Sequence, residues 1–468
     1  MITIAQGRLL GARVGGVTRF LGIPYAAAPT GALRFAPPAR AERWAGTRSA
    51  TSFGPTAPQP ALHSSNANLA PLIGPGWEVG DGACLNLNVW TPDPATRGLP
   101  VMVYLHGGGF MIGSGAAPAF DGASFARGGV VLVTVNYRLG AEGFLALPDA
   151  TNLGLRDQLA ALQWVRENVA AFGGDPDKVT LFGESAGGTS VALLLRSPGS
   201  VGLFRRAIVQ SGHDEMARPL ALTEKLTKAL AARLGVAATV DVFRSIPAAE
   251  VLRGQGALLR GPARPDLRDA QGVDAGHGRA LFLPTTGDDV LPEAAAASLD
   301  VELLIGTTLE EANLGFGAEA FTGLDARAAI AELATTYPHA EALLSQHGLN
   351  DPAVTPARAL TAAYTELMFR APSRRTAARH RGPTFVYDFA WRSPRYGAAH
   401  GLDVPFVFDT TRCCQALLGD EPPETLTRAM HKAWLDFATH GNPGWPAFHD
   451  AGGVMRFDTH SRLSPSLS

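Results

Sequence analysis

Short, almost uninterrupted apolar runs alternate with helical patterns between Pro100 and Ser211. A strand has this composition when helices cover both faces of its sheet, so the pattern predicts a parallel sheet. The predicted strands are residues 101–105, 130–135, 179–182 and 207–209. Between the second and the third, apolar residues recur at helical spacing from Leu155 to Phe172, and Gly173 ends that helix. This alternation of strand and helix is typical of an α/β fold.

Two later stretches, about 218–260 and 325–382, are rich in alanine and leucine and predict helices. Apolar strands reappear at 303–306 and 384–388, so these helices are expected to interrupt one sheet instead of forming a separate domain. A closing helix is predicted over about 425–440. Residues 1–468 are therefore expected to form a single domain with two helical insertions.

The composition of the chain indicates which classes of binding partner are disfavoured. Hydrophobic residues make up 46% of the chain and charged residues 18%, which is ordinary for a soluble globular protein. The 40 basic and 42 acidic side chains leave a net charge of −2 and form no basic patch, which disfavours nucleic acid and anionic membranes as partners. The amino terminus does not resemble a secretory signal, and no apolar run has the length of a membrane span. We therefore expect a cytoplasmic protein.

Three cysteines, Cys84, Cys413 and Cys414, are too few and too unevenly spaced for a disulfide framework, and reduced thiols are expected. The segment 55–82 is rich in Pro, Gly, Ser and Asn. Its length predicts either a binding loop or disorder.

The pentapeptide Gly183-Glu-Ser-Ala-Gly187 lies between the predicted strand 179–182 and a helical run at 189–196. In a nucleophile elbow, a serine projects from a sharp and strained turn between a strand and a helix. Glycines flank it because a β-carbon at either position would clash where strand and helix converge. The pentapeptide alone is also compatible with an ordinary glycine-rich turn. Its position between strand and helix favours Ser185 as a nucleophile.

A run of glycines, His106-Gly-Gly-Gly-Phe110, directly follows the predicted strand 101–105. Without side chains in the way, backbone N–H groups of such a run can approach a carbonyl oxygen and form an oxyanion hole. Alone, the run is equally compatible with a flexible turn. Together with a serine elbow downstream it indicates acyl transfer, because that mechanism needs both parts.

The two motifs belong to a longer resemblance. Residues 172–187 resemble the active-site signature of the type-B carboxylesterases, the family that includes cholinesterases and bacterial para-nitrobenzyl esterases. Further similar segments extend the resemblance from near residue 5 to about residue 446; they are residues 22–25, 136–140, 152–158 and 210–212. The resemblance implies an α/β-hydrolase fold, with a mostly parallel central sheet flanked by helices and with helical insertions lining an active-site gorge.

The resemblance also implies an acid and a base. Residues 305–311 match the acid loop of the family, and their register places the acid at Glu311, with Glu310 beside it. Residues 396–408 resemble the histidine loop and place the base at His400. The order Ser185, Glu311, His400 is that of α/β-hydrolases. Either glutamate could instead be a solvated loop carboxylate, and a one-residue bulge would exchange their places.

In the implied mechanism, His400 takes the proton of Ser185 as the serine attacks the ester carbonyl, and then gives it to the leaving alcohol. Glu311 orients the imidazole, and the N–H groups of Gly108, Gly109 and Ala186 bind the oxyanion. Water then releases the acyl group, and no metal or organic cofactor is required. If the pKa of His400 is that of an ordinary histidine, activity is expected to fall below about pH 6–7, because the protonated ring cannot accept the serine proton.

The sequence departs from the family just before Cys84. Relatives carry an acidic pair there, whereas Gly82-Ala83 follows Asp81 in this chain. Secreted relatives also close this loop with a disulfide, for which Cys84 has no upstream partner. Trp77 lies near the place where cholinesterases hold a tryptophan for quaternary ammonium groups. Its register is shifted by a few residues, so we expect it to anchor the loop or line the gorge.

The sequence thus predicts a serine carboxylesterase that hydrolyses neutral, moderately hydrophobic carboxylic esters through an acyl-enzyme on Ser185. An amide- or thioester-cleaving serine hydrolase remains an alternative because the chemistry of the triad is shared. A catalytically silent binding protein on the same fold is disfavoured, because all three triad positions hold competent residues. The expected partner is a small-molecule ester, and the oligomeric state is left open.

Overall fold

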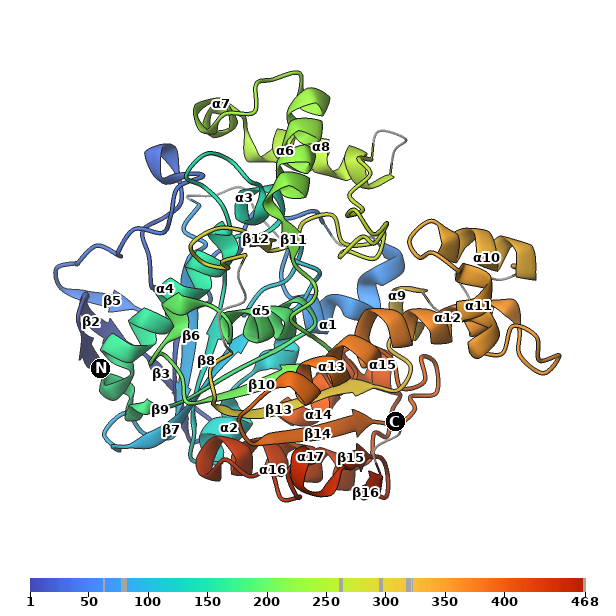
Figure 1. The fold of residues 1–468 in the computed structure, drawn as a ribbon. Coiled ribbons are helices and arrows are strands. Elements are labelled where there is room, and N and C mark those ends of the chain that lie inside the picture. Colours follow the sequence, from blue (N-terminus) through green and yellow to red (C-terminus); the bar gives the residue numbers. More distant parts are fainter. Residues whose placement is uncertain are drawn as a thin grey trace.

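A large mixed sheet runs through the middle of the molecule (Figure 1). The computed structural model describes residues 1–61, 64–76, 82–260, 264–293, 298–316, 321 and 323–465. In these residues the sheet has eleven strands. In spatial order they are β16 (Arg462–Pro465), β15 (Gly453–Phe457), β14 (Thr384–Phe389), β13 (Glu302–Thr308), β10 (Arg206–Gln210), β9 (Gly174–Glu184), β7 (Leu99–Leu105), β8 (Val131–Val135), β6 (Asn86–Thr91), β4 (Val17–Pro24) and β3 (Ala12–Val14).

Neighbouring strands from β8 to β15 run parallel, whereas β16 at one edge and β6, β4 and β3 at the other are antiparallel. Five short strands lie outside this sheet, in two small sheets; they are β1 (Ile2–Ile4), β2 (Gly7–Leu10), β5 (Thr47–Ser49), β11 (Arg218–Pro219) and β12 (Thr285–Thr286). The prediction of a mostly parallel central sheet is confirmed.

The central strands bury both of their faces. In β7, Val101 and Val103 point into one hydrophobic core, whereas Met102 and Tyr104 point into the other. All four side chains are fully buried. This explains why the run reads as continuously apolar instead of alternating with polar residues.

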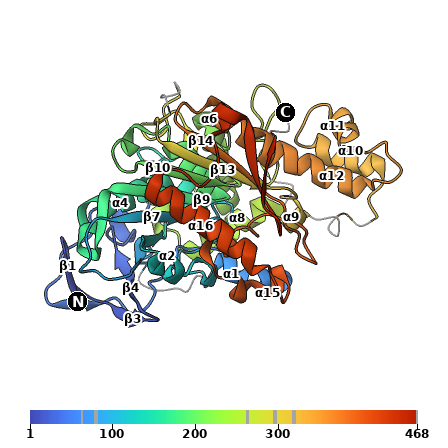
Figure 2. The same ribbon diagram turned by 90° about the horizontal axis from the view of Figure 1, so that it is seen from below.

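Helices cover both faces of the sheet. The helices α3 (Gly140–Phe144), α4 (Leu153–Asn168) and α5 (Ala186–Leu194) contribute to the first core. The helices α2 (Ala123–Arg127), α14 (Val404–Phe408), α15 (Gln415–Leu418) and α16 (Glu424–His440) contribute to the second core. Figure 2, which views the molecule from below, shows α16 lying across the sheet. The closing helix predicted at about 425–440 is therefore α16.

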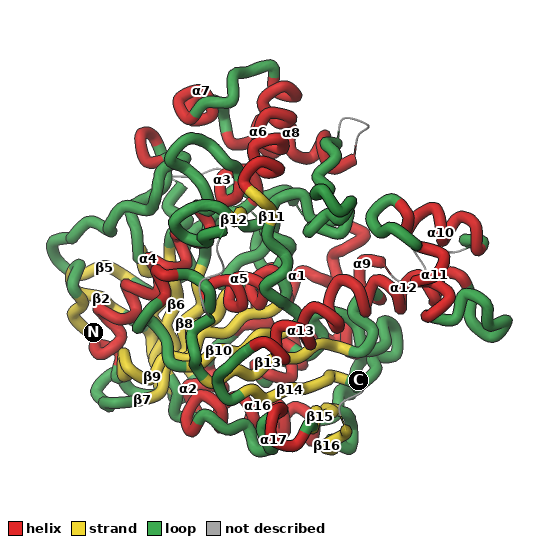
Figure 3. Tube along the Cα trace, viewed as in Figure 1, coloured by secondary structure: helices red, strands yellow, loops and turns green. Residues whose placement is uncertain are grey.

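The two predicted helical insertions project from the sheet in different directions (Figure 1, Figure 3). The first forms the green group at the top of the view, and its helices are α6 (Leu220–Leu234), α7 (Val240–Ser245) and α8 (Ala248–Arg260). In the second, α10 (Ala326–Ala334), α11 (Ala340–Gln346) and α12 (Pro356–Thr365) form the orange group at the right. The π-helix η6 (Glu366–Arg370) and α13 (Ala371–Arg379) follow, and α13 lies back against the sheet, where Ala377 joins the first core. Helices α10, α11 and α12 share a hydrophobic cluster of their own, which includes Leu333, Leu344 and Leu360.

The described part of segment 55–82 contains η2 (Ser64–Leu69) and α1 (Ala70–Ile73). Leu69 and Leu72 pack against the second core. Trp77 and Asp81 lie outside the described residues. Cys84 and Cys414 are buried, Cys413 is exposed, and all three are free thiols. Among the described helices, none combines the length and the apolar character needed to cross a bilayer.

Candidate active site

The predicted nucleophile lies at the junction of β9 and α5. Ser185 has φ 57° and ψ −121°, a backbone conformation that residues with a β-carbon rarely adopt. The turn is held by two hydrogen bonds: Ser185 N–H donates to Gln210 O (2.9 Å), and Thr189 N–H donates to Ser185 O (2.8 Å). The serine therefore projects from a fixed turn at the amino terminus of a helix, whose dipole favours negative charge.

The two glycines of the pentapeptide are required by close backbone approach. A β-carbon at Gly187 would fall on the carbonyl oxygen of Leu105. One at Gly183 would lie 2.5 Å from the carbonyl carbon of Gly187. No real β-carbon tolerates such contacts, so the strand and helix can converge only with glycine at both positions.

The glycine run after β7 lies beside the elbow. A β-carbon on Gly107 would lie 2.6 Å from Glu184 Oε2 and 3.1 Å from the β-carbon of Ser185. Gly108 (φ 110°) and Gly109 (φ 62°) both have positive φ. Gly108, Gly109 and Ala186 line the same cavity as Ser185. The three residues predicted to form the oxyanion hole therefore border the cavity at Ser185.

His400 and Glu311 are joined by a short hydrogen bond. The distance from His400 Nδ1 to Glu311 Oε2 is 2.6 Å. The other carboxylate oxygen, Glu311 Oε1, accepts hydrogen bonds from Ser211 Oγ (2.7 Å) and from Thr308 N–H (2.8 Å). The side chain of Glu311 is fully buried. A buried carboxylate with these partners fixes the ring orientation and makes Nδ1 the protonated nitrogen.

The neighbouring glutamate points the other way. Glu310 forms an ion pair with Arg392, and its Oε2 accepts a hydrogen bond from Ala398 N–H (2.9 Å). Its side chain is 27% exposed. The structure thus gives Glu310 contacts that stabilise the loop before His400, and it gives Glu311 the contact with the imidazole.

The second ring nitrogen of His400 faces another carboxylate. His400 Nε2 lies 3.2 Å from Glu184 Oε1. In the part of the chain that the structure describes, Ser185 Oγ has no hydrogen bond, although Ser185 and His400 line the same cavity. Catalytic serine–histidine contacts are often loose before substrate binds. The structure therefore brings Ser185, His400 and Glu311 together at one cavity, with the histidine turned towards Glu184.

These contacts change the pKa values of both groups. Burial opposes the charged form of His400, but the carboxylates of Glu184 and Glu311 outweigh it and raise its pKa to about 9. Burial also raises the pKa of Glu184, to about 8, although the imidazole opposes this shift. Among the described residues no hydrogen bond reaches Glu184 Oε1, so its attraction to Nε2 is that of two nearby charges.

A second unexpected carboxylate lies nearby. Asp403 Oδ2 accepts hydrogen bonds from Gln210 Nε2 and Tyr387 Oη, both at 2.9 Å. Burial raises its pKa to about 6. Since Asp403 helps to raise the pKa values of both Glu184 and His400, it belongs to the electrostatics of the site.

The cavity at Ser185 has a volume of about 380 Å³. Apolar side chains make up most of its wall; they are Phe110, Met111, Ile112, Ala186, Met216, Ala280, Leu314, Met368 and Phe369. Phe369 also packs against the imidazole of His400, with ring centroids 4.8 Å apart. In the described residues, no group of three or more His, Cys, Asp or Glu side chains is arranged to hold a metal ion.

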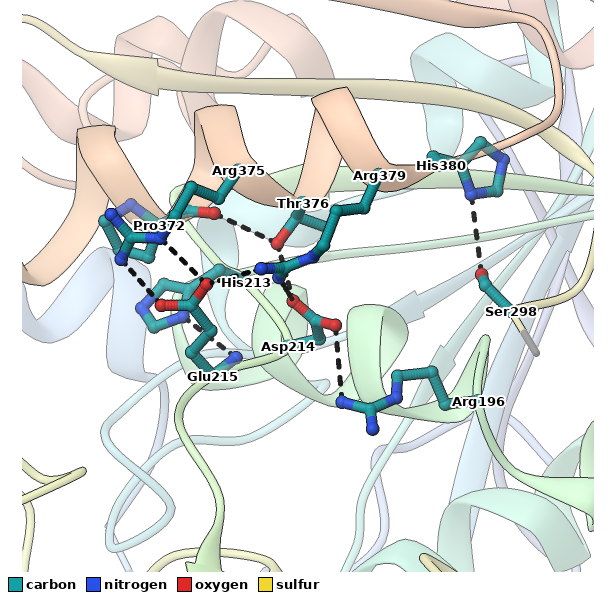
Figure 4. A network of polar contacts seen from close by, with 10 residues as sticks. All are labelled: Arg196, His213, Asp214, Glu215, Ser298, Pro372, Arg375, Thr376, Arg379 and His380. Carbon is teal, nitrogen blue, oxygen red and sulfur yellow. Dashed lines mark hydrogen bonds and ion pairs between the residues drawn. The ribbon is translucent and has the colours of Figure 1, made fainter. Parts of the chain in front are cut away.

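An ion-pair network fixes one wall of the cavity (Figure 4). Arg375 on α13 binds Glu215 (2.6 Å), and Arg379 on the same helix binds Asp214 (2.9 Å) and Glu215 (3.0 Å). The next residue, Met216, lines the cavity. The second insertion therefore holds the chain that leaves β10 in place beside the site.

Sequence reasoning missed four residues of this site: Glu184, Ser211, Arg279 and Asp403. Glu184 lies inside the pentapeptide, and Ser211 lies in a segment that resembles the family, so for these two a signal was present. Ser211 is brought to Glu311 by the parallel pairing of β10 with β13, which aligns Gln210 with Gly306. Such long-range register is not visible in one sequence.

Comparison with known proteins shows the family of the chain. The chain matches the carboxylesterase family over residues 1–463. It is 36% identical to para-nitrobenzyl esterase of Bacillus subtilis (strain 168), over 96% of this chain and 93% of that protein. It is 34% identical to liver carboxylesterase of Sus scrofa, over 100% of this chain and 91% of that protein.

Solved structures give the same result. A PNB esterase structure superposes with a TM-score of 0.83 at 32% identity, covering 100% of this chain and 97% of that one. A carboxylesterase of Geobacillus stearothermophilus also gives a TM-score of 0.83, at 34% identity, covering 99% of this chain and 97% of that one. This chain therefore belongs to the carboxylesterase family and is a carboxylic ester hydrolase with the α/β-hydrolase fold.

Proposed function

We propose that Ser185 is the nucleophile, His400 the general base and Glu311 the acid of this esterase. The observation that carries the proposal is the hydrogen-bonded chain from Ser211 through Glu311 to His400, which ends at the cavity that the strained Ser185 also lines. Ser185 attacks the ester carbonyl, and His400 Nε2 accepts its proton. His400 then protonates the leaving alcohol, and water releases the acid from Ser185.

Two features complete the proposed chemistry. The N–H groups of Gly108, Gly109 and Ala186 stabilise the oxyanion that develops on the ester carbonyl. The apolar wall and the volume of about 380 Å³ suit a neutral, moderately hydrophobic ester. An ester and an anilide with the same acyl group, compared by kcat/KM, test the preference for esters over amides.

We also propose that the chain is one domain, in which residues from about 218 to 260 and from about 325 to 382 are insertions into the α/β-hydrolase sheet. The small-molecule ester is its proposed partner, and the cytoplasm its proposed location. The apolar cavity at Ser185 supports the ester as partner, and the net charge of −2, without a basic patch, disfavours an anionic membrane surface.

The pH dependence tests the role of His400. Only neutral His400 can accept the serine proton, so activity is lost as pH falls through its folded-state pKa. Because the neighbouring carboxylates raise that pKa to about 9, we expect kcat/KM to fall on the acid side from above about pH 7, higher than an unperturbed histidine predicts. The Glu184→Gln variant removes one of these charges and should move the acid limb to lower pH. An acid limb that stays in place in this variant would contradict the electrostatic role of Glu184.

The oxyanion hole is tested best at Gly109. A β-carbon on Gly108 would fall on the carbonyl oxygen of Ile112, so a substitution there disturbs the whole loop. Around Gly109 there is open space, although its φ of 62° disfavours a β-branched residue. We expect Gly109→Val to displace the N–H group and lower kcat by roughly 10²-fold.

Gly235 offers a matched control for this substitution. It has φ 70°, it also has open space around it, and it ends α6 away from the described cavity wall. Gly235→Val should cost similar stability, measured by thermal unfolding, without lowering kcat. Full activity of Gly109→Val would exclude the assigned donor.

A further inference from the structure

The cavity wall carries one charge that the proposed triad does not use. Of the residues that the structure describes, three with ionisable side chains line the cavity: Glu311, His400 and Arg279. Glu311 is engaged by His400, Ser211 and Thr308. Arg279 is therefore the permanent cation on a wall that is otherwise mostly apolar.

Arg279 is carried by a rigid turn. The Asp274 carboxylate accepts hydrogen bonds from Gly276 N–H (2.9 Å) and Gly278 N–H (3.2 Å), and Arg279 N–H donates to Gly276 O (2.8 Å). Arg218, whose side chain is 1% exposed, binds Asp274 at 2.9 Å from the interior. The position of Arg279 is thus set by a buried ion pair and not by a mobile surface loop.

The guanidinium is oriented but not deeply buried. Arg279 Nη2 lies 2.7 Å from Glu332 Oε1 on α10, and its guanidinium carbon lies 5.3 Å from the centre of the Tyr364 ring on α12. The side chains of Arg279 and Glu332 are 34% and 36% exposed. An ion pair with this exposure is weak, so a second carboxylate can share or displace Glu332 at little cost. A planar guanidinium is well suited to bind a carboxylate.

We propose that Arg279 binds a carboxylate carried by the substrate, so that the enzyme also accepts monoanionic esters such as half-esters of dicarboxylic acids. The ester group would lie at Ser185, the hydrocarbon chain against the apolar wall, and the free carboxylate at Arg279. This inference rests on the proposed function of Ser185 and adds a substrate class to it.

Matched ester pairs test the proposal. For a charge on the acyl side, monoethyl adipate is compared with ethyl heptanoate, and for a charge on the alcohol side, acetoxybutanoate is compared with pentyl acetate. The measured quantity is the ratio of kcat/KM for the anionic ester to that for its neutral partner. We expect Arg279→Met to lower this ratio about tenfold for one of the two pairs, which also identifies the side that faces Arg279. We expect Glu332→Gln to raise it about threefold, because a competing carboxylate is removed.

The alternative is that Arg279 only links the turn to α10. In that case Arg279→Met changes both members of each pair by the same factor, and this result overturns the proposal. If Arg279→Met fails to fold, Glu332→Gln decides alone: an unchanged or lower ratio overturns the proposal. Failure of the proposed function is recognised separately, because the Ser185→Ala variant would then still hydrolyse the neutral esters.

Discussion

Replacing Ser185 by alanine should lower kcat by about 10⁴-fold or more, since the acyl-enzyme can no longer form. The loss should appear with neutral esters of any chain length that fit the cavity, because it removes the reacting atom and not a binding contact. A fluorophosphonate should label the wild-type protein at one site, and mass spectrometry of the labelled peptide should identify that site as Ser185.

Ser211 makes this experiment decisive. It is the other serine on the described cavity wall, but its hydroxyl donates to Glu311 Oε1 at 2.7 Å. We therefore expect no label on Ser211 and a much smaller loss of kcat in Ser211→Ala. A label on Ser211, or near-normal turnover by Ser185→Ala, would show that the nucleophile has been assigned to the wrong serine.

The second large effect is expected at the acid. Glu311→Gln should lower kcat by roughly 10³–10⁴-fold, as loss of a triad acid does in other serine hydrolases. The carboxamide oxygen can still accept from Ser211 and Thr308, which leaves its NH₂ group facing His400 Nδ1. Two donors cannot face each other, so the imidazole is driven into the tautomer that cannot accept the serine proton.

Glu310→Gln is the matched control, because it makes the same change one residue away. Its carboxylate binds Arg392 and Ala398 N–H, and a glutamine can keep the second contact. We expect a loss of less than about tenfold in kcat. Circular dichroism and thermal unfolding must show that both variants are folded. If Glu310→Gln were inactive and Glu311→Gln active, Glu310 and not Glu311 would be the acid of the triad.

The sequence predicted best what depends on local composition. Strands β7, β8, β9 and β10 were visible because both faces are buried, which leaves a continuous apolar run. The elbow and the glycine run were visible because close backbone approach excludes every residue but glycine, as Gly183 and Gly187 show. The edge strands were missed: β3, for example, has three residues and no fully buried side chain, so it carries no such signal.

What the sequence could not supply is contact between distant segments. The position of Asp403 in the sequence does not indicate that its carboxylate would act on His400, since this effect depends on the burial of both groups. For the same reason the structure leads us to expect the acid limb at a higher pH than an unperturbed histidine would give. Nothing in the sequence distinguishes Arg279 from the other arginines. In the structure, the ion pair between Arg218 and Asp274 holds the turn of Arg279, and Arg279 lines the cavity.

The backbone of Ser185 has a consequence for how this chain can change over generations. A residue with a β-carbon held at φ 57° and ψ −121° stores strain of order 1–3 kcal/mol, and glycine at this position would relieve much of it. At this position, therefore, glycine would favour stability, whereas the proposed reaction requires serine. With Ser185 as the proposed nucleophile, selection for stability alone favours a substitution that would end catalysis, so we expect serine to persist at this turn only while ester hydrolysis is under selection.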